Sequence, residues 1–263
     1  MYKIILNEVF KNKTGVNLPC IPIDKKTQQI YLQGYKALNM PAYAEKRTYG
    51  NKCYSFCHRL GLLSPEVRTS HVEKLQDYIY KTGLPLSASA SCRKIHVTHQ
   101  DANKAAALSH FANMIGVKIG DIIKIADSSF KYGTDQELLI DKNSFNVGKE
   151  RAFHPDVNNI EGTGQAWIES LFNRIDSIGV KALALDMFGV FVPYDTEIAA
   201  VYDYYLQKIN SYLKAGIKVA IITGGGVSAD NLIRTAFNNK KLSTDGNNNL
   251  ILYLYQGGLG IAF

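Results

Sequence analysis

One short apolar segment, residues 182–185 (Ala-Leu-Ala-Leu), constrains the fold of this 263-residue chain more than any other. It is too short and too apolar for a surface helix, so it predicts a buried β-strand. The strand ends at a single carboxylate, Asp186, and Gly189 and Pro193 break regular structure soon afterwards. Open α/β sheets place their chemistry where a buried strand meets a loop. The alternative is a strand that simply ends in a solvated aspartate.

Strand and helix patterns alternate through residues 86–140 and 166–255, which predicts a parallel sheet with helices on both faces. The expected fold class is therefore α/β, with a Rossmann-like doubly wound parallel sheet. Three predicted strands end in a polar side chain: Asp127, Asp186 and Thr223. Because the carboxyl ends of parallel strands share one edge of the sheet, we expect these three residues to converge in one crevice.

The other expected elements follow from apolar periodicity and from breaking residues. The predicted helices span residues 65–82, 101–115, 165–177, 197–215 and 228–237, and a short helix begins at Asp135. The predicted strands span residues 2–9, 29–32, 87–98, 119–126, 217–222 and 250–255. Residues 11–15 predict a turn, and residues 148–165 predict a linker because they show little periodicity.

The net charge of +7, from 30 Lys and Arg against 23 Asp and Glu, favours anionic ligands. No dense basic run interleaved with aromatic residues is present, so no motif supports nucleic-acid binding. A small phosphorylated molecule and a solvated basic surface account for the charge equally well. No apolar run approaches the roughly 20 residues that span a bilayer, and the apolar stretch after Met1 is too short for a signal peptide. We therefore expect a cytoplasmic protein without a membrane partner.

The four cysteines form only one cluster in the sequence, Cys53 and Cys57 followed by His58. A second ligand pair at zinc-finger spacing is missing, which argues against a structural zinc site. Reduced, partly buried thiols are therefore the expectation.

Four segments together resemble the motifs of the haloacid dehalogenase-like (HAD) superfamily of hydrolases. Residues 185–190 are similar to its first motif, a strand that ends in a nucleophilic Asp, and residues 221–224 to its second, a strand that ends in Thr or Ser. Residues 103–108 are similar to the third, which carries a Lys on a helix. Residues 125–138 are similar to the acidic fourth motif. The long loop within that segment and the context of Thr223 resemble the phosphomannomutase and sugar-phosphate phosphatase branch.

The order of the motifs departs from that family, because the third and fourth precede the first and second. A circular permutation explains this order, with residues 141–180 as the linker and helix that join the old ends. The resemblance then implies an α+β cap in residues 1–85 and a HAD-like core in residues 86–263. The alternative is a homodimer in which two half-domains complete one another.

The resemblance assigns roles to individual residues. Asp186, Lys104 and Thr223 would be catalytic, with Asp186 forming an aspartyl-phosphate. The phosphoryl group would be bound by Thr223, Gly224, Gly225 and Lys104. A Mg²⁺ cofactor would be held by Asp186, Asp127, Asp135 and the backbone carbonyl of Phe188. The implied activity is a phosphohydrolase or phosphotransferase acting on a small phosphorylated metabolite or nucleotide.

Phe188 is the second departure, because phosphatases of the family carry an Asp there that acts as general acid and base. Losing that help costs about 10²–10⁴-fold in rate, which favours a substrate with a good leaving group. Asp195, His96 and His99 are candidates for a replacement acid. Two other functions remain open: a catalytically impaired binding or interaction protein, and a dehalogenase-like hydrolase, whose members tend to carry an aromatic residue at this position.

Overall fold

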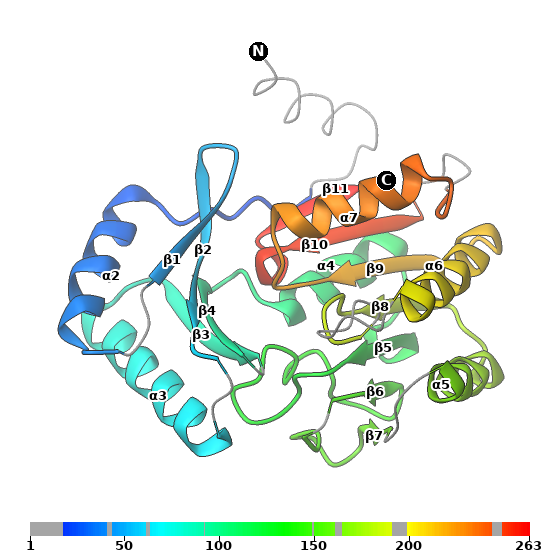
Figure 1. Ribbon diagram of the computed structural model, residues 1–263, viewed down its shortest axis with the longest axis horizontal. Helices are drawn as coiled ribbons and strands as arrows, with labels where there is room; N and C mark the ends of the chain where they lie inside the picture. Colours follow the sequence, from blue (N-terminus) through cyan, green and yellow to red (C-terminus); the bar gives the residue numbers. More distant parts are fainter. Residues whose placement is uncertain are drawn as a thin grey trace.

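The computed structural model describes residues 18–40, 44–61, 64–91, 93–148, 150–160, 165–190, 199–243 and 249–263. Within these ranges the chain forms an α/β fold on two sheets, one of seven strands and one of four (Figure 1). The arrangement is consistent with a Rossmann-like architecture, as the alternation of strands and helices predicts. None of the described helices is long and apolar enough to cross a membrane.

The seven-stranded sheet has the order β11-β10-β9-β8-β5-β6-β7. In chain order its strands are β5 (Ile122–Ala126), β6 (Ser144–Asn146), β7 (Asn158–Asn159), β8 (Ala182–Leu185), β9 (Lys218–Ile222), β10 (Leu250–Leu254) and β11 (Leu259–Ala262). Neighbouring strands run parallel except for β10 and β11, which pair antiparallel. The sheet is therefore mixed, whereas the sequence predicts a parallel one.

Helices cover both faces of this sheet (Figure 1). One face carries α5 (Gln165–Ile178), α6 (Ala199–Lys214) and α7 (Val227–Asn238), and the other carries α4 (Lys104–Ile115). In β8, Leu183 and Leu185 pack in the same core as α5, α6 and α7, whereas Ala182 and Ala184 pack in the core with α4. Because successive side chains of a strand point to opposite faces, a strand that is apolar at every position is buried on both.

The four-stranded sheet has the order β1-β2-β4-β3, with all neighbours antiparallel. Its strands are β1 (Ala44–Tyr49), β2 (Lys52–Arg59), β3 (Leu86–Ser91) and β4 (Lys94–His99). Helices α2 (Lys25–Ala37) and α3 (Pro65–Thr82) pack against it and share one apolar core with it. We call this sheet with its two helices the cap, and the seven-stranded sheet with its helices the core.

Backbone and side-chain hydrogen bonds join the cap to the core. The N–H of Ala90 in β3 donates to the carbonyl of Tyr132, and the N–H of Thr134 donates back to the carbonyl of Ala90, each at 2.8 Å. Arg68 of α3 donates to both carboxylate oxygens of Glu150 at 2.7 and 2.8 Å. The outer strand of the cap sheet is therefore paired with a loop of the core rather than left as an open edge.

Two predicted elements of the cap are wrong. Residues 29–32 lie inside α2 and form no strand, because Asp24 caps a helix there by accepting the N–H of Thr27 at 2.9 Å. The buried positions Thr27, Tyr31 and Tyr35 recur at the spacing of a helix face. Residues 87–98 form the hairpin of β3 and β4 rather than one strand of the core sheet, so the cap sheet continues to His99, beyond the expected boundary at residue 85.

Among the predictions for the core, some are wrong and others are confirmed. Residues 135–139 make a hydrogen-bonded turn instead of a helix. The expected linker contains β7, which extends the sheet beyond β6. The helix predicted at 165–177 is confirmed as α5, and the strand predicted at 217–222 is confirmed as β9. The strand expected at residues 2–9 and the turn at 11–15 lie outside the described residues.

Candidate active site

Three neighbouring strands carry the predicted site residues at their carboxyl ends. β8 lies between β5 and β9, and the pairing places the ends of the three strands side by side. Asp127 follows β5, Asp186 follows β8 and Thr223 follows β9. The N–H of Asp186 continues the ladder by donating to the carbonyl of Ile125 at 2.9 Å. The structure thus brings all three residues to one edge of the sheet.

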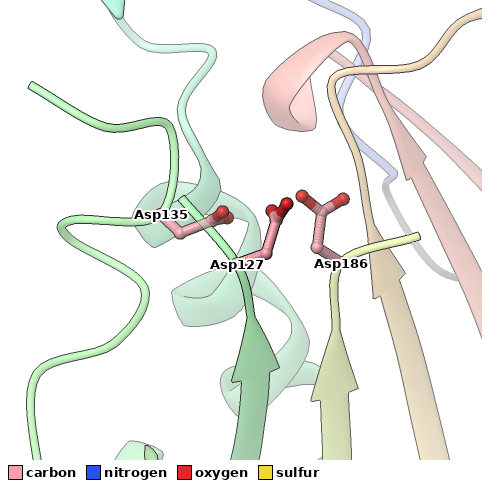
Figure 2. A group of neighbouring side chains, drawn as sticks. All are labelled: Asp127, Asp135 and Asp186. Carbon is pink, nitrogen blue, oxygen red and sulfur yellow. The ribbon is translucent and has the colours of Figure 1, made fainter. Parts of the chain in front are cut away.

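Asp127, Asp135 and Asp186 form a buried cluster, with one carboxylate oxygen of each within 4.8 Å of the others. In Figure 2, Asp127 and Asp186 extend from the ends of adjacent strands toward a common space, and Asp135 reaches in from a loop. Anionic oxygen donors are the ligands that Mg²⁺ prefers. The three side chains therefore fit the metal site that the sequence predicts.

Lys104 links two of these carboxylates. Its Nζ donates to Asp135 Oδ1 at 2.5 Å and to Asp186 Oδ2 at 2.6 Å, and its side chain is buried. Lys104 begins α4, and Asn103 fixes that helix end by accepting the N–H of Ala106 at 2.7 Å. One ammonium against three carboxyl groups leaves room for a further positive charge.

Burial sets the protonation of the cluster. Loss of hydration raises the pKa of Asp186 to about 6, with Lys104 opposing the rise and Asp135 adding to it. Burial and the carboxylates of Asp186 and Asp135 raise the pKa of Asp127 well above its ordinary value. Although burial alone lowers the pKa of Lys104, the two carboxylates outweigh it and raise that pKa. The lysine therefore stays charged, and the raised pKa values of Asp127 and Asp186 show that a negative charge on all three carboxyl groups is unfavourable without a further cation.

Hydrogen bonds from neighbouring residues orient the carboxylates. The N–H of Met187 donates to Asp186 Oδ1 at 2.6 Å. The N–H of Ser128 donates to Asp135 Oδ2 at 3.0 Å, and its hydroxyl donates to Asp127 Oδ1 at 3.1 Å. Ser128 therefore couples the two acidic residues of the fourth segment, although seven residues separate it from Asp135.

Thr223 and the glycines that follow it lie beside Asp186. Thr223 Oγ1 accepts the N–H of Gly225 at 3.0 Å, so this amide is engaged within the loop rather than free for a phosphate oxygen as the sequence predicts. A Cβ on Gly224 would lie 2.5 Å from Gln256 Nε2, and one on Gly225 would lie 2.7 Å from the ring of Phe188. A side chain at Gly225 would thus clash with the ring of Phe188, and one at Gly224 would displace the end of the Gln256 side chain.

Two residues after β10 hold this loop in place. Gln256 donates its N–H to the carbonyl of Thr223 at 3.0 Å, and Tyr255 donates its N–H to the carbonyl of Gly225 at 2.9 Å. Both have left-handed backbones, with φ of 62° and 52°. For residues other than glycine this conformation is unfavourable by roughly 1–2 kcal/mol, and it concentrates at functional sites. Gln256 is not among the predicted site residues. It lies two residues beyond the end of β10, so its signal in the sequence is a polar side chain that follows a buried strand.

A cavity of about 320 Å³ opens over these strand ends. The core supplies the predicted residues to its wall: Lys104, Asp186, Phe188, Thr223, Gly224 and Gly225. The cap supplies residues that the sequence analysis did not place at the site: Arg47, Arg59, Ser91, Arg93, Lys94 and, as only a candidate acid, His96. The alternation of apolar and polar residues in a strand shows which residues share a face, but it does not show which part of the molecule that face contacts. The sequence therefore contains no indication that these cap residues line the cavity.

The three candidates for a replacement acid differ in their position relative to the cavity. His96 lines the cavity together with Asp186. His99 is not among the residues that line it, and its Nδ1 instead accepts the N–H of Asp101 at 3.3 Å. Asp195 lies outside the described residues. Phe188, whose ring has no acidic proton, also lines the cavity.

A single chain assembles this site. Lys104, Asp127 and Asp135 come from the segment before residue 140, and Asp186 and Thr223 come from the segment after residue 180. The two segments meet where β5 pairs with β8, so exchange of halves between two chains is not needed to complete the site. Comparison with models of protein families, with curated proteins and with solved structures finds no match to the chain.

Proposed function

We propose that this protein is a Mg²⁺-dependent phosphohydrolase or phosphotransferase of the HAD-like type, with its motifs in permuted order. The proposal rests on one observation: a buried lysine, Lys104, joins Asp186 to Asp135 beside Asp127. Thr223 lines the same cavity as Asp186 and Lys104. Distant parts of the sequence thus supply a nucleophile, a charge-balancing cation, metal ligands and a phosphate contact in one place.

In the proposed reaction, a carboxylate oxygen of Asp186 attacks the phosphorus of a phosphate ester. The new bond gives an aspartyl-phosphate, and the bond from phosphorus to the leaving oxygen breaks. Water then attacks the phosphorus, which releases inorganic phosphate and restores the carboxylate; in a phosphotransferase an acceptor hydroxyl takes the place of water. Lys104 stabilises the charge that gathers between the nucleophile and the phosphoryl oxygens.

Bound Mg²⁺ would offset the repulsion between the carboxylate and the phosphate anion. Asp127, Asp135 and Asp186 would hold it, with the backbone carbonyl of Phe188 as a further proposed ligand. Thr223 and Gly224 would contact the phosphoryl oxygens. In the proposal, Gly225 joins them once its N–H turns from Thr223 to the substrate.

The phenyl ring of Phe188 has no proton to give to the leaving group. A leaving oxygen of low basicity, as in an acyl phosphate, a pyrophosphate or a nucleotide, departs without such help. We therefore propose a small phosphorylated metabolite or nucleotide with a good leaving group as the substrate.

Phe188 also favours a second candidate function. A protein that keeps the metal cluster and the phosphate contacts but lacks a general acid would bind a phosphorylated ligand without turning it over. Carbon chemistry of the dehalogenase kind is a weaker candidate, because it needs no metal ion, whereas Asp127 and Asp135 beside Asp186 fit one.

Substitution of the nucleophile tests the proposal. Asp186→Asn should lower Mg²⁺-dependent phosphate release by at least about a thousand-fold, because loss of a nucleophile removes the whole covalent route. The assay uses p-nitrophenyl phosphate, acetyl phosphate, nucleotides and sugar phosphates. The matched control is Asp121→Asn, the same change at an exposed position near the opposite end of β5, where Asp121 pairs with Lys181 at 3.1 Å. This control should keep full activity.

Each other outcome has a meaning. Turnover that persists in Asp186→Asn rejects Asp186 as nucleophile. Silence across the panel, with Mg²⁺ binding still measurable by calorimetry, supports the binding function instead. Activity that a chelator leaves unchanged favours carbon chemistry.

A further inference from the structure

The cap wall of the cavity is strongly cationic. Five cationic side chains line the cavity, and Asp186 is the only carboxylate among its lining residues. Lys104 is balanced by the acidic cluster, and Arg59 pairs with Glu45 at 2.9 Å. In the described part of the chain, Arg47 and Lys94 form no ion pair with a carboxylate. Two of the positive charges on this wall, those of Arg47 and Lys94, therefore have no carboxylate counterion among the described residues.

The excess of positive charge affects the pKa of Lys94. It is half-buried in β4, where loss of hydration and the charges of Arg47 and Arg59 lower its pKa. Arg47 in β1 reaches toward the core, with Nη1 3.5 Å from the carbonyl oxygen of Gly224. The unbalanced charge thus extends to the edge of the glycine loop beside Asp186. An anion bound there would relieve the repulsion between these cations.

His96 gives an independent sign of a missing ligand on the same wall. Its side chain lines the cavity, the residue is 5% exposed, and its buried Nδ1 has no hydrogen-bond partner. Leaving such an atom unsatisfied is unfavourable, and native proteins seldom do so without a water, an ion or a ligand nearby. A Cβ on Gly224 would lie 3.2 Å from His96 Cε1, so the ring sits directly against the glycine loop.

We propose that the cap wall binds a second anionic group of the substrate, through Arg47, Lys94 and His96. The substrate is then a small metabolite that carries another oxyanion, a phosphate or a carboxylate, besides the phosphoryl group at Asp186. This inference rests on the proposed function for the position of that first group, whereas binding of the second does not require turnover. A cavity of about 320 Å³ is near the lower limit for ligand sites, which suits a sugar-sized molecule.

Calorimetry with three six-carbon probes tests the proposal on the full-length Asp186→Asn protein in Mg²⁺. Glucose 6-phosphate carries one anionic group, 6-phosphogluconate adds a carboxylate, and fructose 1,6-bisphosphate adds a phosphate. At least one doubly anionic probe should bind ten-fold or more tightly than glucose 6-phosphate, because hydrogen bonds between charged partners are the strong ones. The probe that gains more identifies the second group as carboxylate or phosphate.

Substitutions on the cap locate the effect. Lys94→Met and, as a second variant, Arg47→Gln should each remove most of this preference while changing glucose 6-phosphate affinity less than about two-fold. The matched control is Lys46→Gln, an exposed neighbour of Arg47 on β1 that does not line the cavity. It should keep the preference. Unfolding midpoints close to that of the parent protein confirm that each variant is folded.

Equal affinities for the three probes overturn the proposal, as does an equal loss of preference in Lys46→Gln. Phosphate release by the unmodified protein is measured separately. Selective binding without phosphate release supports the second anion site and counts against the proposed hydrolysis. Phosphate release without tighter binding of a doubly anionic probe supports the proposed hydrolysis and counts against the second anion site.

Discussion

Two lysines line the same cavity, and their surroundings are opposite. Lys104 on the core wall lies between two carboxylates, which raise its pKa. Lys94 on the cap wall lies near arginines and is partly desolvated, which lowers its pKa. Lys104 thus has its counter-charges within the protein, whereas Lys94 and its neighbour Arg47 form no ion pair with a carboxylate of the described residues. The difference divides the cavity into a core wall whose lysine is neutralised and a cap wall that carries positive charge without a bound carboxylate at these two residues.

Removing the two charges should therefore have unequal effects, and this is the largest difference that we expect. Lys104→Met leaves buried carboxylates without their partner and should lower the free energy of unfolding by about 3–5 kcal/mol in the presence of a chelator. Lys94→Met removes a repelled charge and should change it by less than about 1 kcal/mol. Urea denaturation of both variants measures the contrast, and equal losses would contradict it. Added Mg²⁺ should restore part of the Lys104→Met loss.

A second difference between the two regions is a dependence of stability on pH that comes from a buried histidine of the cap. His58 is buried in β2, where burial lowers its pKa to about 4 and Nε2 lies 2.7 Å from the hydroxyl of Tyr31. The unfolded chain binds a proton near pH 6.5 and the folded chain does not, so stability falls as pH drops from 6.5 toward 4. The full effect is roughly 3 kcal/mol.

The replacement His58→Gln cannot titrate, so it should remove this share of the pH dependence. The measurement is the difference in unfolding free energy between His58→Gln and the parent protein at each pH. That difference should shift by roughly 3 kcal/mol in favour of the variant between pH 7 and pH 4. A constant difference would mean that His58 has the same pKa in the folded cap as in the unfolded chain.

The smallest expected effect is at the joint between cap and core. The hydroxyl of Tyr255 donates to the carbonyl of Thr48 at 2.8 Å, and its ring stacks on Tyr54 with centroids 5.1 Å apart. Tyr255→Phe removes only the hydrogen bond and should lower the free energy of unfolding by about 1 kcal/mol. A single cooperative transition should persist in thermal denaturation. If cap and core instead unfold in two steps, this bond contributes more to their coupling than the contact geometry implies.

The sequence predicts the central strands of the core well because their signal is local. β5, β8 and β9 are apolar at nearly every position, and each is followed by the polar residue that the strand-end argument singles out. Parallel pairing then needs only the general rule that such strands share one edge. The positions of Asp127, Asp186 and Thr223 follow from these two facts alone.

The cap was harder to predict for physical reasons. In α2, good helix formers such as Lys and Gln are mixed with Gly34, and only four positions are buried. The short apolar run at residues 30–32 therefore resembles a strand until the cap sheet is present to bury one face of the helix. Residues 86–99 alternate like one long strand, and only the pairing of β3 with β4 and of β4 with β2 shows that they form two strands. The contribution of Arg47 and Lys94 to the cavity depends on how the cap lies on the core, which no local pattern encodes.

The backbone pairing of Ala90 with the loop around Gly133 also bears on how such a chain can be re-engineered. The loop that pairs with the cap is the same loop that carries Asp135 of the acidic cluster. A chimera that exchanges this cap for another would therefore disturb the loop after β5 unless the new module brings an edge strand of matching register. Two backbone hydrogen bonds thus couple the cap to the carboxylates at the sheet edge, so the two parts are not freely exchangeable modules.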